Sequence, residues 1–176
     1  MTKHRTRPIV LLVAIAMLSS LFASCTKQKA STDNIINLLT AEETNIPTGR
    51  IYSSEAPEGS DGFLSEDILT VAYGFPESFD GLSSAAIRLS SFFHPCEFAV
   101  FLCKSANDAE DVALFCRNRI DTLRKYTSSS AELCSMSTEE YSRYIDNAAV
   151  VISGRYVALI ISSDTRAVKR LFLRSV

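Results

Sequence analysis

Cysteine is the residue type whose positions in this chain say most about chemistry. Five cysteines occur in 176 residues. Cys25 directly follows the small residues Ala23 and Ser24, an arrangement in which the thiol can receive a lipid and the chain can be cleaved in front of it. The other four are candidates for thiol or disulfide chemistry: Cys96, Cys103, Cys116 and Cys134.

Several states of these four thiols are compatible with the sequence. Outside the cytoplasm an even number of cysteines favours two disulfides, with three connectivities open. A chain of this length can build its core without covalent links, and a buried thiol then packs as a small apolar group. Cys116 falls on the apolar stripe of a predicted helix. There is no C-x-x-C pair and no spacing that indicates zinc.

The remaining polar side chains do not form a recognisable catalytic pattern. Beyond residue 24, His94 is the only histidine, so no serine or cysteine has another obvious base. His94 and Cys96 offer two metal ligands at most. Four carboxylates lack the alternation of a calcium loop: Glu58, Asp61, Glu66 and Asp67. We therefore expect no catalytic, metal or cofactor residues and no enzyme, although paired carboxylates of a small hydrolase stay a third alternative.

The N-terminus predicts export. Lys3, Arg5 and Arg7 precede an apolar run over residues 9–18, and small residues follow in front of Cys25. We predict a lipoprotein signal peptide over residues 1–24, a lipidated polar tether over 25–31 and a single domain over 32–176. There are two alternatives: ordinary secretion with cleavage after Ala23 or Ser24, and an uncleaved anchor. The run is shorter than the about 20 apolar residues of a membrane-spanning helix.

The charge balance restricts the partners. Removing residues 1–24 leaves 15 basic and 20 acidic side chains, a net charge of −5 with histidine neutral. This argues against nucleic acid as a partner. Acyl chains on Cys25 would hold the protein to the outer face of the cell membrane. Four bases line one face of the last predicted helix, where they suit its dipole: Arg166, Lys169, Arg170 and Arg174.

The first half of the domain predicts little regular structure. Ser31 can cap a short helix with an apolar stripe of isoleucine and leucine. Residues 45–62 contain Pro and Gly repeatedly and predict a loop, with Ile51 and Tyr52 briefly extended. Ser65 can cap a second short helix that ends near Gly74.

The second half predicts an α+β fold. Residues 86–90 and 97–103 predict two strands, and Ser105 with Asp108 begins a long helix ending near residue 126. Residues 148–152 and 156–161 predict a hairpin around Gly154, and Asp164 caps a last helix. The order strand-strand-helix-strand-strand-helix predicts one mostly antiparallel sheet of four strands. Two short helices precede it, and the long helix lies on one face.

The order of segments resembles the DUF4358 family of bacterial lipoproteins, a domain of unknown function. Four segments carry the resemblance within residues 33–173: 69–74 (LTVAYG), 96–101 (CEFAVF), 144–150 (YIDNAAV) and 154–164 (GRYVALIISSD). The family implies the architecture and a place on the cell membrane. It brings no established catalytic or binding residues, so none is transferred to this chain.

The sequence leaves two hypotheses about function. The first is a non-enzymatic module that presents a sheet face or edge to another protein. The second is a lipoprotein that binds a small ligand or works through a thiol, using Cys96 and Cys103 or a pocket beside the long helix.

Overall fold

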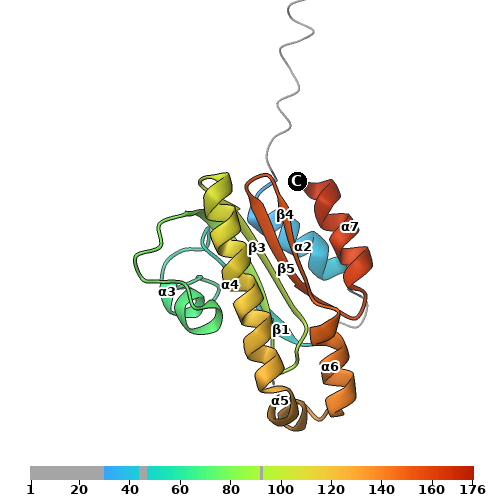
Figure 1. Ribbon diagram of the computed structural model, residues 1–176. Helices are drawn as coiled ribbons and strands as arrows, with labels where there is room; N and C mark the ends of the chain where they lie inside the picture. The colour runs from blue at the N-terminus through green and yellow to red at the C-terminus, as the bar shows by residue number, and fades with distance from the viewer. Residues whose placement is uncertain (1–29, 44–46, 92) are drawn as a thin grey trace, which may run out of the picture.

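One open antiparallel sheet of five strands forms the centre of the molecule. The strands are β1 (Gly49–Ser53), β2 (Leu82–Ser90), β3 (Glu97–Cys103), β4 (Ala149–Ser153) and β5 (Tyr156–Ile161), in the spatial order β1-β2-β3-β5-β4. The computed structural model, shown in Figure 1, describes residues 30–43, 47–91 and 93–176. The α+β class and the antiparallel sheet are as the sequence predicts.

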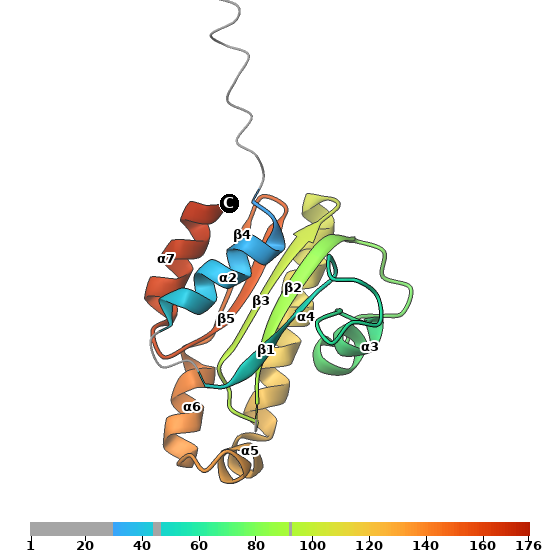
Figure 2. The ribbon, with the colours of Figure 1, turned by 180° about the vertical axis from the view of Figure 1, so that it is seen from behind.

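Helices cover both faces of the sheet. The long helix α4 (Ala106–Lys125) lies across one face, while α2 (Thr32–Glu42) and α7 (Thr165–Ser175) lie on the other, as Figures 1 and 2 show from opposite sides. Because neighbouring residues of a strand point to opposite faces, Phe101 packs in the core under α4 and Phe98 in the core under α2 and α7. The central strands β3 and β5 are therefore mostly apolar on both sides.

Capping side chains determine where the three main helices begin. The side chains of Ser31, Ser105 and Asp164 each accept a hydrogen bond from the backbone N–H three residues further on, at 3.2, 3.1 and 3.0 Å. Each bond satisfies a donor that has no partner inside its helix. These helices begin where the sequence predicts, and α4 ends at Lys125 as expected.

The sheet has one strand more than the four predicted. β1 lies in the stretch that the sequence predicts as a loop with only Ile51 and Tyr52 extended. The strand is short and begins at Gly49, so its own sequence gives little strand signal. Pairing with β2 orders it, with Arg50 opposite Leu89.

The connections also hold more helix than predicted. The serine-rich stretch 128–142, expected to contain one helical turn, is mostly helical in α5 (Thr127–Leu133) and α6 (Thr138–Asp146), with residues 134–137 between them. The expected second short helix is α3 (Glu66–Ile68), which continues as the π-helix η1 (Leu69–Tyr73). Ser65 stands at its N-cap without a side-chain hydrogen bond to the helix. Gly74 ends it at φ 72°, a conformation that glycine adopts without strain.

The domain has two distinct ends. At one end, the Tyr156 hydroxyl donates to the Ala30 carbonyl at 2.8 Å and holds the start of α2 beside the β4–β5 hairpin. Arg155 of that hairpin donates to the Lys104 carbonyl at 3.1 Å, just before α4. α4 then runs for 20 residues, about 30 Å, and α5 lies at the opposite end of the molecule (Figure 1). Among the described residues, no helix combines the length and apolar character needed to cross a membrane.

Candidate functional site

A cleft of about 630 Å³ opens at the end of the domain that is remote from Ala30. The β2–β3 connection, the C-terminal part of α4, α5 and α6 form it, and we call it the distal cleft. Its apolar wall consists of Leu89, Phe93, Leu123, Tyr126, Leu133 and Tyr141. Its polar side chains include Ser90, His94, Glu97, Arg119, Thr122, Ser129 and Ser130.

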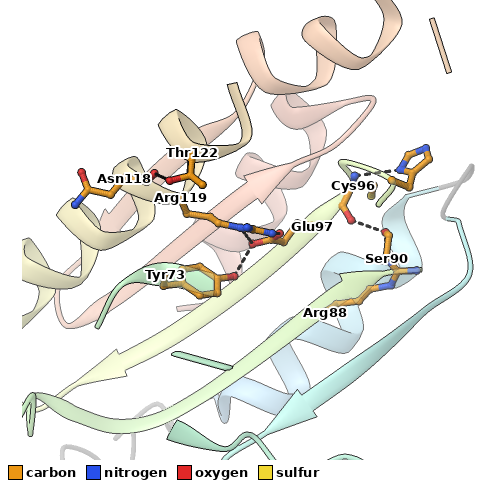
Figure 3. Close-up of polar contacts among 9 residues, drawn as sticks. Tyr73, Arg88, Ser90, Cys96, Glu97, Asn118, Arg119 and Thr122 are labelled. Carbon is orange, nitrogen blue, oxygen red and sulfur yellow. Dashed lines mark hydrogen bonds and ion pairs between the residues drawn. The ribbon is translucent and has the colours of Figure 1, made fainter. Parts of the chain in front are cut away.

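A buried ion pair forms the polar floor of the distal cleft. Glu97, the first residue of β3, is 4% exposed and accepts hydrogen bonds from Arg119 of α4. Nη2 of Arg119 lies 2.8 Å from Oε2, and Nε lies 3.3 Å from both carboxylate oxygens. The Tyr73 hydroxyl donates to Oε1 at 2.7 Å, as Figure 3 shows. The carboxylate thus bonds to two elements on the same side of the sheet and joins η1 to α4.

The electrostatics favour the neutral form of Tyr73 and the protonated form of Arg119. Burial and the negative charge of Glu97 raise the pKa of Tyr73 well above its ordinary value. Burial alone would lower the pKa of Arg119, but the adjacent Glu97 charge outweighs it and raises that pKa. The two charges balance, so the floor of the cleft carries no net charge.

His94 lies at the edge of the same cleft in a fixed orientation. Its Nδ1 accepts a hydrogen bond from the Cys96 backbone N–H at 3.1 Å, and its ring stands edge-on to Tyr144 at 5.3 Å between centroids. Burial lowers the pKa of His94, which favours the neutral ring. With Nδ1 accepting, the ring proton of the neutral form sits on Nε2. That ring then has no free lone pair with which to act as a base.

Three large apolar side chains stand exposed at the mouth of the distal cleft. Phe93, Tyr126 and Leu133 are 65%, 61% and 60% exposed and come from three separate segments. Phe93 also has φ of 63°, a left-handed conformation that costs a non-glycine residue about 1–3 kcal/mol. Single exposed apolar side chains are ordinary, but a strained phenylalanine grouped with two others around a cleft is typical of a binding surface.

The four candidate thiols are all free and do not meet at one site. Cys96 belongs to the core under α2 and α7, whereas Cys103 and Cys116 belong to the core under α4. Burial raises the pKa of Cys96 and of Cys103 to about 12 and that of Cys116 further. Thiolate, the reactive form, is therefore scarce at neutral pH at these three positions. Cys134 is only partly buried.

Thiol labelling of the native domain is expected to modify Cys134 first. In a Cys25→Ala variant near neutral pH, Cys96, Cys103 and Cys116 should react only after denaturant is added, because burial protects them and suppresses their thiolates. Mass spectrometry of the labelled peptides gives the order. Fast labelling of Cys96 or Cys103 in the native protein would contradict the packing described above.

The other residues singled out from the sequence lie apart from the distal cleft. Asp61 lies 3.7 Å from Arg50 in an exposed ion pair, and Glu66 and Asp67 begin α3. The four bases of α7 face outward, and three of them line a polar hollow beside Asn147. Within residues 30–43, 47–91 and 93–176, no three His, Cys, Asp or Glu side chains are grouped so as to hold a metal ion. Cys25, the predicted signal peptide and most of the predicted tether lie outside these ranges.

Sequence reasoning missed the ion pair at the floor of the cleft. The helical pattern places Arg119 among the outward-facing bases of the long helix, but in the structure it reaches Glu97. A signal was available, because Glu97 is the one charged side chain of a strand whose other residues are apolar. A charge in a buried strand needs a partner, and a base on the covering helix is the expected one.

Comparisons with known proteins identified no similar protein. No protein-family model, no curated protein and no solved structure matches the chain. The resemblance to the DUF4358 family stays a prediction.

Proposed function

We propose that this protein is a bacterial lipoprotein, held by acyl chains on Cys25 at the outer face of the cell membrane. Its domain is a non-enzymatic module that binds another protein at the distal cleft. It acts without a cofactor and without nucleic acid. The resemblance to the DUF4358 family agrees with this proposal.

One observation carries the proposal: three of the seven large apolar side chains that stand exposed among the described residues gather around one cleft, at the end of the domain remote from its N-terminal attachment. Phe93, Tyr126 and Leu133 surround a cleft at the C-terminal end of α4, a helix about 30 Å long whose N-terminal end lies on the side of the domain where Ala30 is held. A lipid on Cys25 would place that attachment end near the bilayer and leave the cleft facing outward. Aromatic anchors around a pocket are characteristic of protein interfaces.

The polar groups of the cleft support binding rather than catalysis. Glu97 is occupied by Arg119 and Tyr73, and the Nδ1 of His94 by a backbone N–H. None of these groups has the free lone pair of a general base. What they offer to an incoming molecule is hydrogen-bond donors within apolar walls.

A small ligand is the second candidate, and the size of the cleft favours it. A volume of about 630 Å³ falls in the range of about 300–1,000 Å³ typical of ligand pockets. The thiol-dependent alternative has less support, because Cys96 and Cys103 are both buried with raised pKa values.

Site-specific photo-crosslinking in cells tests the proposal. A photoreactive residue at position 133, at the mouth of the cleft, should capture one dominant partner protein. The matched control is position 114 on the outer side of α4, where Leu114 is similarly exposed at 51% but does not line the cleft. We expect the adduct from position 133 alone, and its loss when Tyr126→Asp is added.

The same adducts from both positions would contradict the proposal that the partner binds at the distal cleft. No adduct from position 133, while position 114 crosslinks to unspecific neighbours, would favour the small-ligand candidate.

A further inference from the structure

The charge balance of the distal cleft restricts what can enter it. Among the described residues that line it, Glu97 is the only carboxylate and Arg119 the only guanidinium or amine, and their charges neutralise each other. His94, the remaining titratable base there, has a lowered pKa and is neutral near pH 7. A ligand with a net charge would therefore lie in a partly buried site without a counter-charge, which is unfavourable.

Arg119 still has hydrogen-bonding capacity beyond its partner. A guanidinium has five N–H donors, and the bonds to Glu97 use Nε and Nη2. No described residue accepts a hydrogen bond from Nη1. The Arg119 side chain is 20% exposed and lines the cleft, so this group faces an incoming molecule. A neutral carbonyl oxygen matches such a donor without disturbing the charge balance.

The walls require an apolar group beside that carbonyl. Leu89, Leu123 and Tyr141 line the cleft inside, and exposed apolar side chains surround its mouth. The cleft is thus shaped for one apolar side chain to enter while the flanking surface of the partner covers Phe93, Tyr126 and Leu133. A small molecule filling only the cavity would leave those three side chains in water.

We propose that the distal cleft selects an uncharged peptide segment, binding a large apolar side chain in the cavity and the adjacent backbone carbonyl at Arg119. This inference rests on the proposed function and specifies its partner. Peptide termini and charged side chains are excluded from the cavity by the balanced pair. The strained Phe93 holds an apolar side chain at the mouth in advance of binding.

Three probes that share the phenylalanine side chain and differ in charge at the termini test the selection. They are N-acetyl-phenylalanine N-methylamide, which is neutral, N-acetyl-phenylalanine, which is an anion, and phenylalanine N-methylamide, which is a cation at about pH 6.5. Nuclear magnetic resonance follows the side-chain signals of Phe93, Tyr126 and Leu133 during titration. The neutral probe is expected to bind about tenfold more tightly than either charged probe, with shifts at these signals.

Two variants should change the charge preference of the cleft, one toward anions and the other toward cations. Glu97→Gln leaves Arg119 unbalanced, so the anionic probe should gain affinity relative to the neutral one. Arg119→Gln leaves Glu97 unbalanced, so the cationic probe should gain. Arg117→Gln is the matched control, because Arg117 is exposed on the same helix and does not line the cleft. It should leave the preference of the wild type unchanged.

If the variants at positions 97 and 119 fail to fold, the order of the three probe affinities in the wild type and in Arg117→Gln still tests the inference. Equal or tighter binding of a charged probe would overturn the inference, and so would the absence of binding by all three. The outcome for the proposed function is separate. A partner crosslinked at position 133 would still support the proposed interaction module, even if the cleft shows no preference for uncharged segments.

Discussion

Replacing Glu97 with methionine is expected to lower the free energy of unfolding by about 3 kcal/mol. Methionine keeps most of the side-chain volume but removes the acceptor of both Arg119 and Tyr73. Breaking a buried pair costs about 3–5 kcal/mol, and the lower end applies because Arg119 is 20% exposed and can recover some hydration. Chemical denaturation followed by circular dichroism measures the loss.

A double-mutant cycle separates the ion pair from the packing. In Glu97→Met with Arg119→Met the unpaired charge is gone, so we expect a smaller loss than in Glu97→Met alone. The coupling between the two positions should therefore exceed the loss caused by Arg119→Met alone. Tyr73→Phe alone should cost about 1 kcal/mol, the value of one hydrogen bond. Strictly additive losses at positions 97 and 119 would show that the pair contributes nothing beyond its two side chains.

Replacing Cys25 with alanine is expected to move the protein almost completely from the membrane fraction to the soluble fraction. Each buried CH₂ of an acyl chain contributes about 0.8 kcal/mol, so two chains give stable anchoring and their loss leaves none. The domain itself has no helix, among its described residues, that could take over. Fractionation with metabolic labelling by a fatty-acid analogue measures both location and lipid.

Cys134→Ala provides the control for that experiment, since it removes another accessible cysteine without touching the predicted lipid site. It should stay in the membrane fraction and keep the label. Membrane retention of Cys25→Ala would contradict lipidation and favour the uncleaved anchor. Release of the wild type into the medium would instead favour ordinary secretion.

The elements with strong local signals were predictable from the sequence. The caps at Ser105 and Asp164, and Gly154 in the hairpin with φ of 59°, fix those boundaries through contacts within a few residues. The boundaries of β3 and β5 followed from continuous apolar runs. The sequence did not indicate that α2 and α7 lie on the same face of the sheet, because that depends on packing between segments from opposite ends of the chain.

The elements that the sequence missed are those stabilised by distant partners. β1 is ordered by its pairing with β2, and α5 packs Ala131 into the core under α4 although its sequence is dominated by serine. The same holds for the candidate site. Arg119 reads as an exposed base in its helical pattern, and only the position of β3 beneath α4 brings it to Glu97. Local patterns carry no information about which strand lies under which turn of a helix.

The ladder between β3 and β5 decides the order in which the sheet can be completed. Phe98 pairs with Ile160, so the whole of α4, α5 and α6 separates the two strands along the chain. A chain that emerges from a membrane N-terminus first can join β1, β2 and β3 well before β5 arrives. During that interval the outer edge of β3 has unpaired backbone groups and apolar side chains on both faces, which is the kind of segment that aggregates. The C-terminal hairpin thus protects the rest of the sheet from other copies of the chain, and a chain truncated before Tyr156 would lack this protection.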